Sequence, residues 1–223
     1  MAIRADDFTE ASTVSLTAHT PTGANAGTGW TLEATVNIGA LVAQVDGADD
    51  AAKASGDRAD SGMYLSLQPN PTVDQYDVQF TITAIDSSSA NHTVGLIGRG
   101  DAGSRDNLYE FNIGGTGSFE LWKRVAGVST QLASFAGTLN VNDVFKLEIR
   151  TATKKGYENG VERVSSADNA ITQVGRAGLC IGEIAEVGNN TRTLWRLDGF
   201  SYTEFITGPI AGLRTMGLTG VGV

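Results

Sequence analysis

Side chains that could act as an acid, a base or a nucleophile are few in this chain. Glycoside hydrolysis needs a pair of carboxylates facing one bond, and the nearest grouping is Glu183 with Glu186. A nucleophilic triad needs a histidine, but His19 and His92 both lie beside threonine in polar, loop-like segments. Cys180 sits in an apolar run, which is typical of a small buried residue. The sequence therefore predicts no catalytic residues and no resident cofactor.

Oxygen-rich loops are the places where a metal ion could bind. Asp101, Asp106 and Asn107 share one loop, and we take these three residues as weak candidates for a calcium site. A second loop contains Asp49, Asp50, Asp57 and Asp60. Neither spacing matches the calcium loop of helix-loop-helix sensors, and loop acids of this kind are usually solvated. With two histidines and one cysteine far apart in the chain, zinc has no ligand set.

Aromatic residues on a strand are the second kind of candidate site. Trp122 is predicted to face outward, where an exposed indole stacks on a sugar ring. The alternative, which we favour, is that Trp122 packs under a loop or a subunit contact. Together with Trp122, we assign Tyr109 and Asp101 to a possible glycan-binding surface.

The charge of the chain excludes some partners. Sixteen basic against 25 acidic residues give a formal net charge of −9, and phosphate backbones bind to clustered Lys and Arg, so nucleic acid is excluded. No stretch approaches the roughly 20 apolar residues of a membrane helix, so no membrane association is expected. The N-terminus lacks the basic region and apolar core of a signal peptide, which predicts folding in a cytoplasm.

Alternating apolar and polar residues predict an all-β fold. Tyr76 to Ala84, Tyr109 to Ile113 and Phe145 to Arg150 each place apolar side chains on one face and polar side chains on the other. Asn159-Gly160 predicts the tip of a hairpin, because both residues tolerate the positive φ of a type I′ turn. Residues 47–61 are small and polar, which predicts a long exposed loop rather than a strand, with a short helix as the alternative. In all we expect about twelve to fourteen strands.

The last segment of the chain, residues 206–223, differs in character from the rest. It combines one charged residue with several glycines and scattered aliphatic residues, whereas a free tail is usually polar. We therefore divide the chain into a domain at 1–205 and an extended C-terminal arm at 206–223 that docks onto a neighbouring surface. The residues expected to make this contact are Ile206, Ile210, Leu213, Met216, Leu218 and Val221.

The order of these elements resembles the concanavalin A-like lectin/glucanase superfamily, most closely its laminin-G-like and pentraxin-like branches. The resemblance covers most of residues 6–205 and rests on segments 108–113, 117–125, 143–149, 159–161, 175–179 and 197–200. It implies a jelly-roll sandwich of two curved antiparallel sheets, one of them concave. Glycosidases of that superfamily share a Glu-x-Asp-x-x-Glu strand, which is absent here.

These observations favour a structural or adhesive module over an enzyme. Our main hypothesis is a surface protein of a tailed-bacteriophage virion, used for capsid decoration or in a fibre and made in the host cytoplasm. It would be a homo-oligomer, most simply a trimer, with the major capsid protein or another virion protein as its partner. The alternative is a lectin-like carbohydrate-binding module. A glycoside hydrolase that uses Glu183 and Glu186 is a third and weaker hypothesis.

Overall fold

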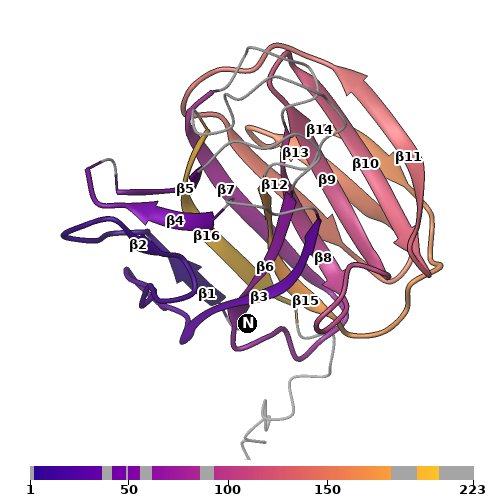
Figure 1. Ribbon diagram of the computed structural model, residues 1–223. Coiled ribbons are helices and arrows are strands. Elements are labelled where there is room, and N and C mark those ends of the chain that lie inside the picture. The colour runs from indigo at the N-terminus through magenta and orange to yellow at the C-terminus, as the bar shows by residue number, and fades with distance from the viewer. Residues whose placement is uncertain are drawn as a thin grey trace, which may run out of the picture.

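The computed structural model describes residues 3–36, 42–48, 50–55, 62–85, 93–181 and 195–205. These residues form sixteen strands and no helix, arranged as two antiparallel sheets stacked face to face (Figure 1). The prediction of an all-β, two-sheet sandwich is therefore confirmed, with more strands than we expected. No part of this region is a helix long and apolar enough to cross a membrane. His92, Glu183, Glu186 and the arm at 206–223 lie outside the described residues.

A seven-stranded sheet forms one layer, with the strand order β11-β10-β9-β8-β15-β6-β3. Its outer face turns away from the other sheet and toward the viewer in Figure 1. Its strands are β3 (Gly29–Val36), β6 (Gly62–Gln68), β8 (Thr93–Gly100), β9 (Leu108–Gly114), β10 (Ser118–Val125), β11 (Val128–Ala136) and β15 (Arg176–Ile181).

A nine-stranded sheet forms the second layer, with the order β14-β13-β12-β7-β16-β5-β4-β2, and β1 pairs with β16 beside this path. Strands from both ends of the described chain thus meet in one sheet. Its strands are β1 (Ile3–Asp6), β2 (Val14–Ser15), β4 (Val42–Asp46), β5 (Ala51–Ser55), β7 (Tyr76–Ala84), β12 (Val144–Ile149), β13 (Lys154–Glu158), β14 (Val161–Ser166) and β16 (Arg196–Glu204).

Phenylalanines from both sheets fill the space between the layers. Phe145 of β12 lies 5.2 Å from Phe119 of β10, 6.1 Å from Phe111 of β9 and 6.2 Å from Phe80 of β7, measured between ring centroids. All four side chains are fully buried. The tilted and edge-on ring contacts match the electrostatic preference of aromatic pairs. Gly156 of β13 makes room for this cluster, because a Cβ at that position would lie 2.6 Å from the Phe111 ring.

Two hairpins have two-residue turns, and the sequence predicts one of them. Asn159 and Gly160 have φ angles of 49° and 78° and join β13 to β14, as the Asn-Gly signal predicts. Ala126 and Gly127, with φ angles of 50° and 80°, join β10 to β11 in the same way. Alanine is an unusual residue in the left-handed region, so this second turn gave a weaker signal in the sequence.

The prediction of a long loop at 47–61 is wrong, because β5 forms within it. Ala51 and Ala52 are fully buried, and Ala52 pairs with Leu197 of β16. Alanine is small enough to be buried where two sheets approach closely, so the absence of large apolar side chains does not exclude a strand. Small residues are therefore compatible with a buried strand as well as with a loop.

We predict that Phe145→Ala lowers the free energy of unfolding by about 3–5 kcal/mol, because it opens a cavity between the two sheets. Phe135→Ala is the matched control: Phe135 is 37% exposed on β11, so its loss should be much smaller. Equilibrium urea unfolding followed by tryptophan fluorescence measures both variants. Equal losses would contradict a core centred on Phe145.

Candidate functional site

The loop at 101–107 uses its polar groups to fasten itself to neighbouring segments. Asp101 accepts hydrogen bonds from Asn107 Nδ2 at 2.7 Å and from Gln173 Nε2 at 3.1 Å. Asn107 Oδ1 accepts one from the Ala126 amide at 3.1 Å, and the Asp106 carbonyl accepts one from the Gly127 amide at 3.0 Å. In the part of the chain that the structure describes, no group of three or more His, Cys, Asp or Glu residues could hold a metal ion. The polar groups of this loop therefore position the turn between β10 and β11.

Tyr109 lies in the core and has no exposed surface, so it is not placed to stack on a ligand. Its hydroxyl donates to Asp168 Oδ1 at 2.7 Å and accepts from the Ile171 amide at 3.3 Å. Burial and the hydrogen bond to Asp168 raise the pKa of Tyr109 to about 12. Lys123 pairs with the other carboxylate oxygen of Asp168. Tyr109 thus ties the segment between β14 and β15 to the core.

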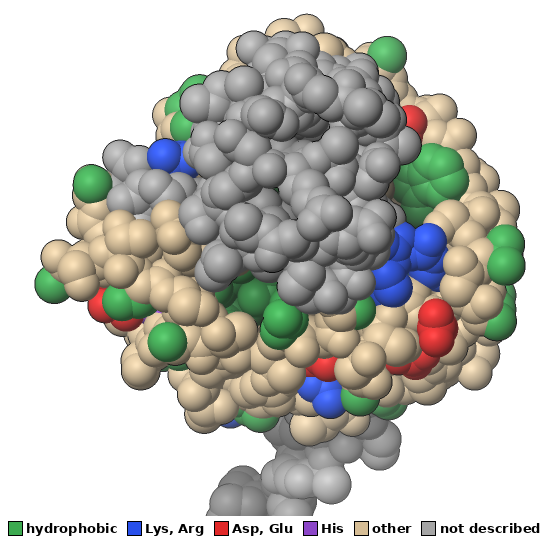
Figure 2. Space-filling view, viewed as in Figure 1, with side chains coloured by type: hydrophobic (Ala, Val, Ile, Leu, Met, Phe, Trp, Pro, Cys, Tyr) green, Lys and Arg blue, Asp and Glu red, His purple; other side chains and the backbone are tan. Residues whose placement is uncertain are grey.

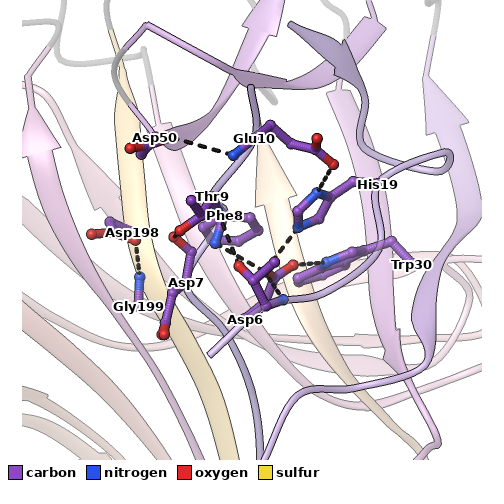
Figure 3. Close-up of polar contacts among 11 residues, drawn as sticks. Asp6, Asp7, Phe8, Thr9, Glu10, His19, Trp30, Asp50, Asp198 and Gly199 are labelled. Carbon is purple, nitrogen blue, oxygen red and sulfur yellow. Dashed lines mark hydrogen bonds and ion pairs between the residues drawn. The ribbon is translucent and has the colours of Figure 1, made fainter. Parts of the chain in front are cut away.

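A second polar network, near the N-terminus, was not foreseen from the sequence (Figure 3). His19 is 2% exposed; its Nε2 lies 2.9 Å from Asp6 Oδ1 and its Nδ1 lies 2.7 Å from Glu10 Oε1. The other oxygen of Asp6 accepts a hydrogen bond from Trp30 Nε1 at 2.6 Å, and the Phe8 amide donates to Oδ1 at 2.9 Å. His19 lies outside the strands, as the sequence predicts, but it is buried and bonded on both ring nitrogens.

The charge state of His19 follows from its two partners. Ionised carboxylates can only accept hydrogen bonds, so an imidazole held between Asp6 and Glu10 donates from both ring nitrogens. Burial alone would lower the pKa of His19, but the hydrogen bonds and charges of Asp6 and Glu10 outweigh it and raise this pKa. Both nitrogens are occupied, so neither can take a proton from a substrate. The network has a structural role in joining the first strand to Trp30 and the core.

Polar and aromatic side chains gather on the outer face of the seven-stranded sheet, over β8, β9 and β10. Strand pairing sets them in two adjacent rows, because the registers align Gly95 with Asn112 and Glu120, and Ile97 with Glu110 and Trp122. Neighbouring strands are about 4.8 Å apart, so these side chains share one compact area. We call these six residues the outer-face site: Gly95, Ile97, Glu110, Asn112, Glu120 and Trp122.

The groups of the outer-face site are held in fixed positions. Glu120 accepts hydrogen bonds from Trp122 Nε1 at 2.9 Å and from Ser118 Oγ at 3.2 Å, which orients the partly exposed indole. Gly95 allows the side chains of Asn112 and Glu110 to pack over β8, since a Cβ there would lie 2.6 Å from Asn112 Oδ1 and 3.3 Å from Glu110 Oε1. Asn112 Oδ1 is buried and has no hydrogen-bond donor among the residues that the structure describes. The site thus holds an oriented ring and a polar oxygen whose hydrogen-bonding capacity is unused.

The outer face of the nine-stranded sheet is different, because its charges neutralise each other. Asp77 of β7 pairs with Lys146 at 3.2 Å and with Arg150 at 2.9 Å, and Arg150 also pairs with Glu148 at 3.1 Å. As the sequence predicts, Lys146, Glu148 and Arg150 point away from the core. A face whose charged groups are paired in this way has little to offer a ligand.

Figure 2 views the molecule from the side of the seven-stranded sheet. Where described residues are in view on this side, toward β10 and β11, hydrophobic, basic and acidic side chains lie next to one another. Such a surface can contact the apolar face of a small ring while its carboxylate and amide oxygens accept hydrogen bonds from hydroxyl groups.

The sequence makes Trp122 a candidate, although packing under a loop or a subunit contact is favoured for it, and it does not single out the other members of the outer-face site. Glu110, Asn112 and Glu120 alternate with the core residues of β9 and β10, so the pattern already placed them on the opposite face. The pairing of β8 with β9, which brings Gly95 beside Asn112, spans a loop whose length fixes no register.

No protein-family model matches the chain, and no curated protein matches it in sequence. Among solved structures it is similar to the carbohydrate-binding module CBM66 from Bacillus subtilis, with 17% identity, a TM-score of 0.55, and 78% of this chain and 92% of that chain covered. It is also similar to the exoplasmic/lumenal domain of VIP36 in its Ca²⁺/Man-bound form, with 6% identity, a TM-score of 0.56, and coverage of 84% and 88%. A Bacillus subtilis protein of unknown function with a galectin-like fold is 12% identical, with a TM-score of 0.54 and coverage of 78% and 88%. These likenesses show the fold, a lectin-like jelly roll.

We predict that Tyr109→Phe lowers the free energy of unfolding by about 1–2 kcal/mol, because Asp168 loses a buried donor and the Ile171 amide loses its acceptor. Urea unfolding measures this loss. If Tyr109 instead belonged to a ligand surface, the variant would keep the stability of the wild-type protein and lose binding.

We predict that stability contributed by His19 falls as the pH rises. The folded pKa lies above the ordinary value of 6.5, so this contribution is complete below pH 6.5 and is lost as the pH passes through the folded value. His19→Gln should lose about 1–3 kcal/mol at pH 6 and a smaller amount at pH 8.5. Urea midpoints of both proteins at the two pH values give the comparison. A difference that does not change with pH would show that His19 is neutral in the folded protein.

Proposed function

We propose that this chain is a non-catalytic carbohydrate-binding module that holds a glycan on the outer-face site. The observation that carries the proposal is the position of Trp122 beside Glu110 and Asn112 on adjacent strands. A sugar presents C–H groups on the faces of its ring and hydroxyl groups around its edge. The indole suits the C–H face, and the carboxylate and amide oxygens suit the hydroxyls. The site therefore combines an apolar surface with a few fixed polar groups, as small-ligand sites do.

The charge of the site favours a neutral glycan. Glu110 and Glu120 are both acidic, and Glu110 is only 5% exposed. Bringing a carboxylated or sulfated sugar against a buried carboxylate costs free energy, because two like charges then share a poorly solvated space. The basic side chain of Arg124, further along β10, is directed to the turn and not to the site, because its Nε donates to the Gly127 carbonyl. The net charge of −9 acts in the same direction.

The fold supports the proposal without deciding it. The similar structures include one named as a carbohydrate-binding module and one that holds mannose, so this architecture is able to carry a sugar-binding surface. Fold alone does not fix function, so the side chains of this chain have to supply the binding surface. The prediction of a virion surface protein depends on the arm at 206–223, which is outside the described residues, and it stays a prediction.

The first test is a glycan array probed with the full-length protein, once with calcium and once with EDTA. We expect neutral glycans to give the strongest signals and acidic glycans to give weak ones. Because the described residues offer no metal-binding cluster, we expect the two conditions to agree. A signal that disappears in EDTA would place a calcium ion at the binding surface. No signal above background in either condition would contradict the proposed function.

We predict that Trp122→Ala weakens binding of the strongest array glycan by about tenfold or more, because the stacked ring surface is lost. Tyr157→Ala is the matched control: Tyr157 is a partly exposed aromatic residue on the outer face of the other sheet, with Lys146 Nζ 4.3 Å from its ring centroid. This control should bind like the wild-type protein. Isothermal titration calorimetry measures all three affinities. Equal affinities for wild type and Trp122→Ala would exclude the outer-face site, and release of reducing sugar by the wild-type protein would contradict a non-catalytic role.

A further inference from the structure

β11 is an edge strand with unusually little protection. Among the described residues it pairs with β10 alone and ends the order of the seven-stranded sheet. It is nine residues long, and most of its positions are exposed. An edge strand presents a row of unpaired backbone N–H and C=O groups that can form a ladder with another strand. Charges, proline, a β-bulge or a very short length usually prevent this pairing, and of these devices β11 has one β-bulge, at Leu132.

The other strands at the ends of the two sheet orders have such protection. β2 is two residues long, β3 contains Glu33, and β14 contains Glu162 and Arg163. By contrast, no charged residue and no proline lies between Arg124 and Asp143, a stretch that includes all of β11. In a chain with a net charge of −9, a strand that carries no charge of its own is where two copies can approach with little repulsion. One charged group lies against β11, that of Arg163 of β14, whose guanidinium lies 4.9 Å from the Phe135 ring centroid.

A two-fold axis would match β11 with itself. Leu132 is the extra residue of a β-bulge, because Trp122 pairs with Gln131 and Leu121 with Ala133. Val128 and Phe135 pair with Val125 and Phe119, whose side chains both face the core, so these two residues lie on the same face of β11. Ser129 and Ser134 pair with Arg124 and Glu120 and lie on the outer face. An axis between Gln131 and Leu132 therefore opposes Val128 with Phe135 and Ser129 with Ser134, two pairs that match in position and in chemistry. Nearer the axis it opposes Thr130 with Ala133 and Gln131 with Leu132.

The exposed apolar side chains of β11 agree with this arrangement. Val128 is 67% exposed and Phe135 is 37% exposed. In an antiparallel pair about that axis, Val128 faces Phe135 of the partner subunit, and Ser129 faces Ser134 of the partner subunit. Both exposed apolar residues are then covered, and the backbone groups of the edge gain hydrogen bonds.

We propose that two copies of this chain associate through β11, in an antiparallel and isologous contact that joins their seven-stranded sheets into one continuous sheet. The axis runs perpendicular to the sheet, so both outer-face sites face the same side. If the proposed function holds, the dimer binds a glycan-covered surface with two sites at once. The dimer contact itself does not depend on sugar binding.

The test is the molar mass of the full-length protein by light scattering on a sizing column, over a range of concentrations. We expect the wild-type protein to reach twice the chain mass of 23.3 kDa. In Ser129→Lys/Ser134→Lys the introduced lysines face each other across the axis, and the mass should fall by half. Ser129→Glu/Ser134→Glu should also be a monomer. An equimolar mixture of the two variants should return to the mass of a dimer, since opposite charges then meet, and this recovery also shows that both variants are folded.

Val161→Lys/Ser165→Lys is the matched control, because it adds the same charges at exposed positions of β14, the edge strand of the other sheet. It should remain a dimer. A wild-type protein that is a monomer at every concentration would overturn the proposal. So would a trimer, or any oligomer whose mass the β11 substitutions leave unchanged.

Discussion

The burial of every second side chain between two sheets is the constraint on which the rest of the structure depends. Once Phe80, Phe111, Phe119 and Phe145 fill that space, the alternation of the strands sends their neighbours to the outer faces. Residues of the inner faces are then unavailable for binding, whatever their chemistry. Tyr109 shows this clearly, since its ring is in the core and its hydroxyl holds a connecting segment. Function has to reside on an outer face, in a loop or at a sheet edge.

The outer faces of the two sheets differ in how their polar groups are paired. The outer face of the nine-stranded sheet carries ion pairs among four residues, so their charges neutralise one another. These residues are Asp77, Lys146, Glu148 and Arg150. On the seven-stranded sheet, Glu120 orients the indole of Trp122, and other polar groups stand over a glycine. A buried oxygen that lacks a donor costs free energy, and a bound hydroxyl group would remove this cost. The difference between the faces, more than the fold, is the reason for proposing a glycan site.

Much of the fold could be predicted from the sequence, because alternation and the Asn159-Gly160 turn are local signals. Errors arose where burial did not need large apolar residues, as at Ala51 and Ala52 of β5. The site was only partly predictable. Trp122 stands out by its type, but Gly95 joins it through a strand pairing that local sequence does not determine. The burial of His19 depends equally on contacts with residues of other segments, Asp6 and Trp30 among them. Single residue types therefore pointed to the chemistry, and pairing in three dimensions assembled it.

The measurement that tests the central claim most directly is an NMR titration with the strongest glycan of the array, observing the indole N–H signals. The chain has three tryptophans, and Trp30 and Trp195 are 4% and 1% exposed, so each indole reports a separate environment. We expect the Trp122 indole signal and the backbone amides of Gly95 and Asn112 to shift, while the Trp30 and Trp195 indole signals stay in place. Shifts confined to other segments, with the Trp122 signal unchanged, would contradict a glycan site on the outer face of the seven-stranded sheet.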